Sequence, residues 1–123
     1  LITLSTFPDY IYFSALLCFL GHIYPIWLKF NGGKGIAVYV GILFAFSIYL
    51  ALLFILIWTI VLYLSKYSSL SSLISTLIIF LYSITLSNFN MSLFFFITFI
   101  IIVFTHKENI LRLKNKSENK TKF

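Results

Sequence analysis

The residues best able to do chemistry in this sequence gather at three polar breaks between long apolar segments. The first break contains Asn31-Gly32-Gly33-Lys34-Gly35 and leads directly into an apolar run. Glycines allow close backbone approach, and consecutive N–H groups ahead of a helix can hold an oxyanion with support from the helix dipole. Lys34 adds a full positive charge. The pattern predicts an anion-binding loop, and the alternative interpretation is a flexible interfacial turn that acts as a hinge.

The second break begins at Lys66 and is rich in serine. Ser69 and Ser72 are three residues apart, so they share one face at the start of the next predicted helix. Hydroxyls at a helix start either cap backbone N–H groups or contact a phosphate. Capping is the commoner use, and phosphate binding is therefore the second interpretation of these serines.

The third break begins at the end of the last apolar segment. On a helix, His106 and Asn109 share a face and Arg112 lies near it. A histidine, an amide and a guanidinium together can hold and polarise a phosphorylated substrate. The alternative is a solvated basic tail on anionic lipid, which does not explain His106 and Asn109 as naturally.

The remaining polar residues give weaker indications. His22 lies inside the first apolar segment, and we expect it to have a structural role. The sequence has two histidines, three acidic residues and one cysteine, and their wide separation predicts no metal site.

The composition predicts what must position these breaks. Hydrophobic residues make up 61% of the chain and charged residues only 10%, which indicates an integral membrane protein. The basic residues cluster after position 106, in the order Lys107, Arg112, Lys114, Lys116, Lys120 and Lys122. Such a tail suits an anionic cytoplasmic membrane face. A nucleic-acid partner is excluded, because neither a basic folded face nor a soluble module with interleaved aromatics is present.

Four apolar blocks span residues 10–28, 36–65, 70–87 and 91–105. The second block contains no charge, and at about 1.5 Å per residue it is too long for one untilted crossing. We therefore divide it near residues 46–48. The sequence then predicts an all-α protein with about five transmembrane helices.

Charge placement supports that division. Lys34, Lys66 and the basic tail all belong on the cytoplasmic side by the positive-inside tendency, which requires an even number of crossings between each pair. We expect residues 1–123 to form a single transmembrane domain, with residues 106–123 as a basic cytoplasmic tail.

Together the three breaks resemble the PlsY family, the bacterial membrane glycerol-3-phosphate acyltransferases that use acyl phosphate. The family pattern Gly-His-x-x-Pro, Phe and x-Gly-Gly-Lys-Gly-Val-Ala is matched by Gly21-His22, Pro25, Phe30 and Gly32-Gly33-Lys34-Gly35-Ile36-Ala37. The pattern Arg-Tyr-x-Ser-Leu-x-Ser is matched by Lys66-Tyr67-Ser68-Ser69-Leu70-Ser71-Ser72. The third motif is matched by His106, Asn109-Ile110, Arg112-Leu113, Glu118 and Lys120.

The resemblance implies a seven-helix fold in the bacterial inner membrane, with the active site and the carboxyl end facing the cytoplasm. The family's first motif, a Ser, Gly and Asn-rich loop ending in Arg, has no counterpart in residues 1–21, which implies that this chain is the carboxyl-terminal part of such a protein.

The implied reaction transfers an acyl group from acyl phosphate to the 1-hydroxyl of glycerol 3-phosphate without a cofactor. By the same resemblance, phosphate is held by Gly32, Gly33, Lys34 and Gly35, with contributions from Ser69, Ser72 and Arg112. His106 and Asn109 lie at the reacting centre, and Glu118 is structural. A different class stays open: a non-catalytic membrane protein or inactive fragment in which the glycine loop is a hinge.

Overall fold

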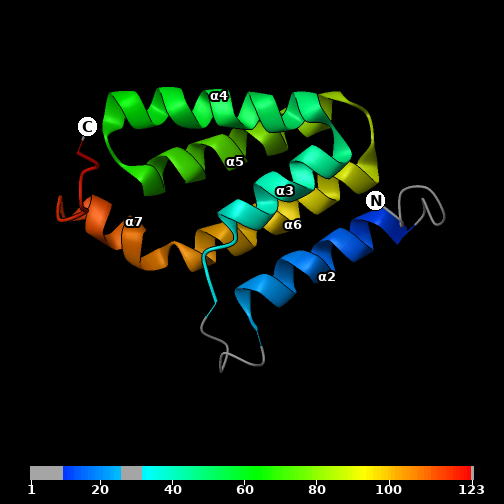
Figure 1. The fold of residues 1–123 in the computed structure, drawn as a ribbon, viewed down its shortest axis with the longest axis horizontal. Coiled ribbons are helices and arrows are strands. Elements are labelled where there is room, and N and C mark those ends of the chain that lie inside the picture. Colours follow the sequence, from blue (N-terminus) through cyan, green and yellow to red (C-terminus); the bar gives the residue numbers. More distant parts are fainter. Residues whose placement is uncertain (1–9, 26–31, 123) are drawn as a thin grey trace.

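The computed structural model describes residues 10–25 and 32–122, and this part of the chain contains helices but no strands. The helices, in chain order, are α2 (Ile11–Ile23), α3 (Ile36–Phe46), α4 (Ile48–Ser65), α5 (Ser68–Thr85), α6 (Phe89–Thr105) and α7 (Lys107–Lys114). Figure 1 shows α4 and α5 side by side, with α3 and α6 beneath them and α2 at the edge. The all-α architecture predicted from the sequence is confirmed.

Short connections set the boundaries of the central helices. Ser47 alone separates α3 from α4, in an extended conformation with φ −164° and ψ 128°. Lys66 ends α4 with a φ of 61°. Asn88 caps α6 by accepting a hydrogen bond from the backbone N–H of Met91 at 3.0 Å. Because α3 ends and α4 begins on either side of Ser47, the division of the long apolar block near residues 46–48 is confirmed.

An aromatic cluster joins four of the helices. Tyr39 of α3 lies 6.4 Å from Phe19 of α2, 5.6 Å from Phe54 of α4 and 6.0 Å from Phe95 of α6, measured between ring centroids. All four side chains are buried. Aromatic pairs at these separations stabilise a core beyond the area that they bury.

The lengths of the helices differ from the predicted crossings. Only α4 and α5 in the described part of the chain are long and apolar enough to span a membrane alone, and α6 with α7 gives a third span if the bent pair is counted. The helices α2 and α3 have 13 and 11 residues, fewer than the roughly 20 that an untilted crossing needs. Helix α2 ends at Ile23 where the sequence predicted a segment to Leu28, and residues 26–28 lie outside the described residues. Five crossings remain a prediction.

The chain after α6 returns to the start of α5. Helices α6 and α7 meet at a bend of 62°. Beyond α7, the backbone N–H of Thr121 donates to the carbonyl oxygen of Lys66 at 2.8 Å. The segment predicted as a basic tail thus contains a helix and a folded return, which brings the third polar break to the second.

Candidate functional site

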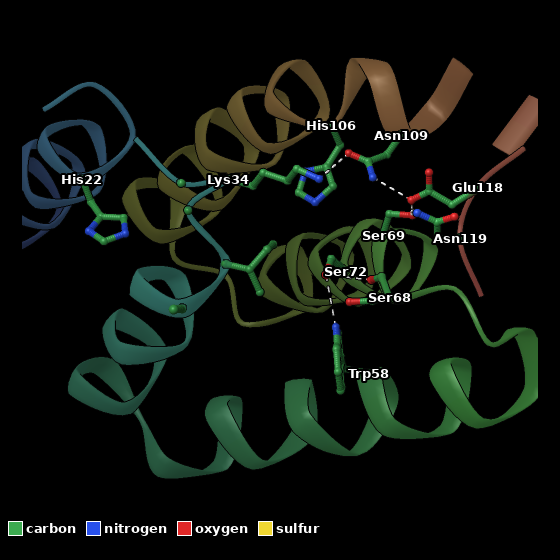
Figure 2. Close-up of a pocket in the computed structure, with 14 residues that line it drawn as sticks. His22, Lys34, Trp58, Ser68, Ser69, Ser72, His106, Asn109, Glu118 and Asn119 are labelled. Atoms are coloured by element: carbon green, nitrogen blue, oxygen red, sulfur yellow. Dashed lines mark hydrogen bonds between the residues drawn. The ribbon is translucent and has the colours of Figure 1, made fainter. Parts of the chain in front are cut away.

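The three polar breaks meet at one cavity of about 410 Å³. Figure 2 shows side chains from α3, α4, α5, the α6–α7 junction and the carboxyl-terminal segment around it. The cavity therefore brings together residues that lie more than seventy positions apart, such as Lys34 and Asn109.

Two helices begin at this cavity. Gly35, Ile36 and Ala37 at the start of α3 line it, and so do Ser68 and Ser69 at the start of α5. Neither helix has a side-chain hydrogen bond from its capping residue. The N–H groups of a first helical turn have no partner within the helix, and the macrodipole makes that end positive. The cavity therefore attracts anions from two directions.

Lys34 and Asn109 are joined in one hydrogen-bond chain. The Lys34 ammonium donates to Oδ1 of Asn109 at 2.5 Å, and Nδ2 of Asn109 donates to Oε1 of Glu118 at 2.6 Å. Asn109 is only 6% exposed. A carboxylate can only accept, so Glu118 fixes the amide with its oxygen toward Lys34.

Glu118 is the acceptor for three neighbours. Its carboxylate accepts from the Ser69 hydroxyl at 2.7 Å, from Asn109, and from Nε of Arg112 at 2.7 Å. Burial by itself would raise the pKa of this carboxyl, but these hydrogen bonds and the Arg112 charge outweigh burial and lower the pKa of Glu118 to about 2. Glu118 is thus an anion at neutral pH and ties α5, α7 and the final segment together.

His106 stands just beyond the end of α6 and is 2% exposed. Its Nδ1 lies 2.8 Å from the carbonyl oxygen of Ile102, an acceptor only, so Nδ1 is the protonated nitrogen and Nε2 is free to accept a proton. Burial lowers the pKa of His106, the Ile102 contact raises it, the Lys34 charge lowers it and Glu118 raises it, with a net lowering. The cavity is therefore lined by a neutral imidazole at neutral pH.

Both predicted serines line the cavity but already use their hydroxyl protons. Ser69 donates to Glu118, while Ser72 donates to the carbonyl oxygen of Ser68 at 3.0 Å and accepts from Nε1 of Trp58 at 3.1 Å. A hydroxyl has one proton to donate. To donate to a phosphate, either serine must first give up its protein acceptor.

Two residues that were predicted to bind substrate do not line this cavity. Arg112 bonds to Glu118, with its side chain 43% exposed, and does not line the cavity. Gly32 lines a second cavity of about 740 Å³, which shares Gly33 and Lys34 with the first. His22, predicted to be structural, does line the first cavity and is exposed.

Sequence reasoning missed Trp58, Ser68 and Asn119, which also line the cavity. Trp58 lies within an unbroken apolar run, where an aromatic residue gives no sign of a site. Ser68 and Asn119 adjoin predicted residues and would have been found by including the neighbours of each motif. Within residues 10–25 and 32–122, no group of three His, Cys, Asp or Glu residues is placed to hold a metal ion.

Comparison with known proteins shows extensive similarity. The family described as glycerol-3-phosphate acyltransferase matches residues 1–116. A glycerol-3-phosphate acyltransferase from Pelagibacter ubique is 56% identical over 116 residues, which cover 94% of this chain and 60% of the relative. One from Anaplasma marginale is 39% identical over 109 residues, covering 89% of this chain and 55% of the relative.

Two crystal structures of PlsY, an integral membrane glycerol 3-phosphate acyltransferase, have the same fold. The glycerol 3-phosphate form aligns with a TM-score of 0.92 at 31% identity, over 98% of this chain and 62% of that one. The lysophosphatidic acid form aligns with a TM-score of 0.91 at 32% identity, over 97% and 63%. The chain thus spans about 60% of the length of the Pelagibacter ubique relative.

Proposed function

The chain belongs to the glycerol-3-phosphate acyltransferase family, and we propose that it acts in transfer of a fatty acyl group from acyl phosphate to glycerol 3-phosphate. The products are lysophosphatidic acid and inorganic phosphate, and the reaction is the first step of phospholipid synthesis. We place the protein in the bacterial inner membrane. The cavity and the basic segment after α6 face the cytoplasm in this proposal, because basic residues favour that anionic face.

The observation that carries the proposal is the convergence of two helix starts and Lys34 on one cavity beside His106. Both substrates bear phosphate groups, which repel one another. Helix starts and a lysine offset that repulsion without a metal ion. A cavity of about 410 Å³ falls within the range of small-molecule sites, roughly 300 to 1,000 Å³.

In the reaction, the 1-hydroxyl oxygen of glycerol 3-phosphate attacks the carbonyl carbon of the acyl phosphate. A new ester bond forms, the bond between the acyl carbon and the phosphate oxygen breaks, and phosphate leaves. Acyl phosphate is a mixed anhydride with a good leaving group, so no serine nucleophile is required. The site contributes mainly orientation and electrostatic stabilisation.

The hydroxyl proton has two candidate acceptors, Nε2 of His106 and a substrate phosphate oxygen. His106 has the tautomer that a base needs, since Nδ1–H is held by Ile102. Asn109 presents its oxygen toward Lys34 and so holds the ammonium in the cavity. In either case the neutral imidazole and the ammonium act on the same substrate pair.

The test measures phosphate release from palmitoyl phosphate by two purified proteins in lipid vesicles. One is this chain, and the other is a chimera that joins to this chain the part of the Pelagibacter ubique relative that it does not cover. We expect release that depends on glycerol 3-phosphate, and a loss of at least about a hundredfold in Lys34→Ala and in His106→Ala. Lys122→Ala, an exposed change far along the tail, is the matched control.

The non-catalytic alternative predicts a different outcome. If neither protein releases phosphate in response to glycerol 3-phosphate, the enzymatic proposal is wrong. If the reaction occurs but both variants keep normal rates, the assignment of the site is wrong while the activity stands.

A further inference from the structure

The glycine loop is pressed against the end of α2. A Cβ atom added to Gly32 would lie 2.2 Å from the carbonyl oxygen of Ile23, and one added to Gly35 would lie 2.8 Å from Cε2 of Phe19. Both approaches are closer than side chains permit. The absence of Cβ atoms at these positions therefore lets the loop lie directly on α2.

This packing puts His22 beside the loop. Nε2 of His22 lies 3.6 Å from the position that a Cβ atom would occupy on Gly33. Figure 2 shows His22 projecting from α2 at the opposite end of the cavity from Asn109 and Glu118, with Lys34 between them. His22 thus borders the part of the cavity where α3 begins.

Several polar groups of the cavity are already bonded to the protein, whereas the His22 imidazole is not bonded to any described residue. Lys34, Ser69 and His106 each make hydrogen bonds to the protein. Within the part of the chain that the structure describes, His22 makes none, and it is exposed. A structural histidine is normally held by hydrogen bonds, whereas an imidazole without them keeps its N–H for a ligand.

We propose that His22 binds substrate, donating a hydrogen bond to the phosphate group held between Gly33 and the start of α3. This inference rests on the proposed function and adds a contact to the same site. The shared chemistry is a phosphate monoester or acyl phosphate head group. In this arrangement His22 adds a hydrogen-bond donor at the α2 end of the cavity, while Lys34 supplies its positive charge from the middle.

The test combines binding with kinetics. Inorganic phosphate is titrated against this chain in detergent, and the Michaelis constants for glycerol 3-phosphate and palmitoyl phosphate are measured in the chimera. His22→Leu removes the donor, while His22→Gln and His22→Lys keep one. Cys18→Leu, an exposed change one turn earlier on α2, is the control.

We expect His22→Leu to weaken phosphate binding about tenfold and to raise one Michaelis constant by a similar factor, with kcat nearly unchanged. The constant that rises identifies which substrate His22 contacts. His22→Gln and His22→Lys should recover most of the loss. An unchanged affinity and two unchanged Michaelis constants in His22→Leu overturn the inference, and so does a chain that binds no phosphate.

Failure of the two proposals can be told apart. A chimera that transfers acyl groups normally in His22→Leu refutes only the His22 contact. A chimera without activity, whose phosphate binding still falls tenfold in His22→Leu, refutes only the proposed reaction. A lower melting temperature in His22→Leu without a selective loss of phosphate affinity assigns His22 a structural role and overturns the inference.

Discussion

Glu118 and Glu108 contact the same arginine in very different surroundings, which makes them a matched pair. Glu118 is 2.7 Å from Nε of Arg112 with its side chain 9% exposed, while Glu108 is 3.9 Å from Nη1 of Arg112 with its side chain 76% exposed. We therefore compare Glu118→Gln with Glu108→Gln. Each change removes one charge and preserves the size of the side chain.

The expected magnitude follows from what glutamine can accept. In Glu118→Gln, the amide oxygen can still accept from Asn109 and Ser69, but the new NH₂ group then faces the N–H of Arg112, donor against donor. Turning the amide over places the NH₂ group against the Asn109 donor instead. Exposed pairs contribute about 0.2 to 1 kcal/mol, whereas removing one partner of a buried pair costs about 3 to 5 kcal/mol.

Arg112 is 43% exposed, so solvent screens part of its interaction. We therefore expect Glu118→Gln to cost about 2 kcal/mol of the free energy of unfolding, between the two limits. For Glu108→Gln we expect less than about 1 kcal/mol, from a weak i,i+4 pair and the helix dipole.

The assay is equilibrium unfolding in mixed micelles with increasing denaturing detergent, followed by the helical signal in circular dichroism. Glu118→Gln should also lower phosphate affinity, because a disturbed Asn109 no longer holds Lys34 in place. Equal effects of the two substitutions on unfolding would refute the reasoning that the Glu118 carboxylate organises the site.

Three further predictions concern pH and the loop. Because the folded-state pKa of Glu118 is about 2, below the ordinary 4.5, its contribution to the free energy of unfolding is complete above pH 4.5 and is lost as pH falls toward about 2. Unfolding measured on both sides of that pH window, with Glu118→Gln as the control, tests this loss. The lowered pKa of His106 keeps the imidazole neutral, so the acid limb of the pH–rate profile of the chimera should lie below the ordinary 6.5, and a limb above it would contradict this. Gly35→Ala, at φ 85° and against Phe19, should cost about 1 to 3 kcal/mol in the same unfolding assay, whereas Gly21→Ala, where a Cβ meets nothing within 4 Å, should stabilise α2 by roughly 0.5 to 1 kcal/mol.

Several features of the fold could be predicted because they depend on local sequence. The division near residues 46–48 followed from the length of one apolar block, and α3 and α4 do meet at Ser47. The serines at the start of α5 followed from a break in hydrophobicity. The end of α2 could not be placed in the same way, because an apolar run does not show where hydrogen bonding within the helix stops.

Most residues that line the cavity could be named from the sequence, but their contacts could not. Arg112 fits a substrate-binding pattern by spacing, yet the structure turns it to Glu118. His22 fits a structural role by its apolar neighbours, yet it lines the cavity. Both assignments depend on which face of a helix meets another element, and helical spacing alone leaves that undecided.

The sequence by itself determined an all-α membrane protein with three polar breaks, since hydrophobicity and segment length are local properties of the chain. The tertiary structure decided which groups those breaks bring together. The 62° bend between α6 and α7 and the return of Thr121 to Lys66 place Glu118 against Asn109 and Ser69. The Ser69–Glu118 contact joins residues 49 positions apart. Its formation depends on how the helices pack, which the order of residues along a single helix does not encode.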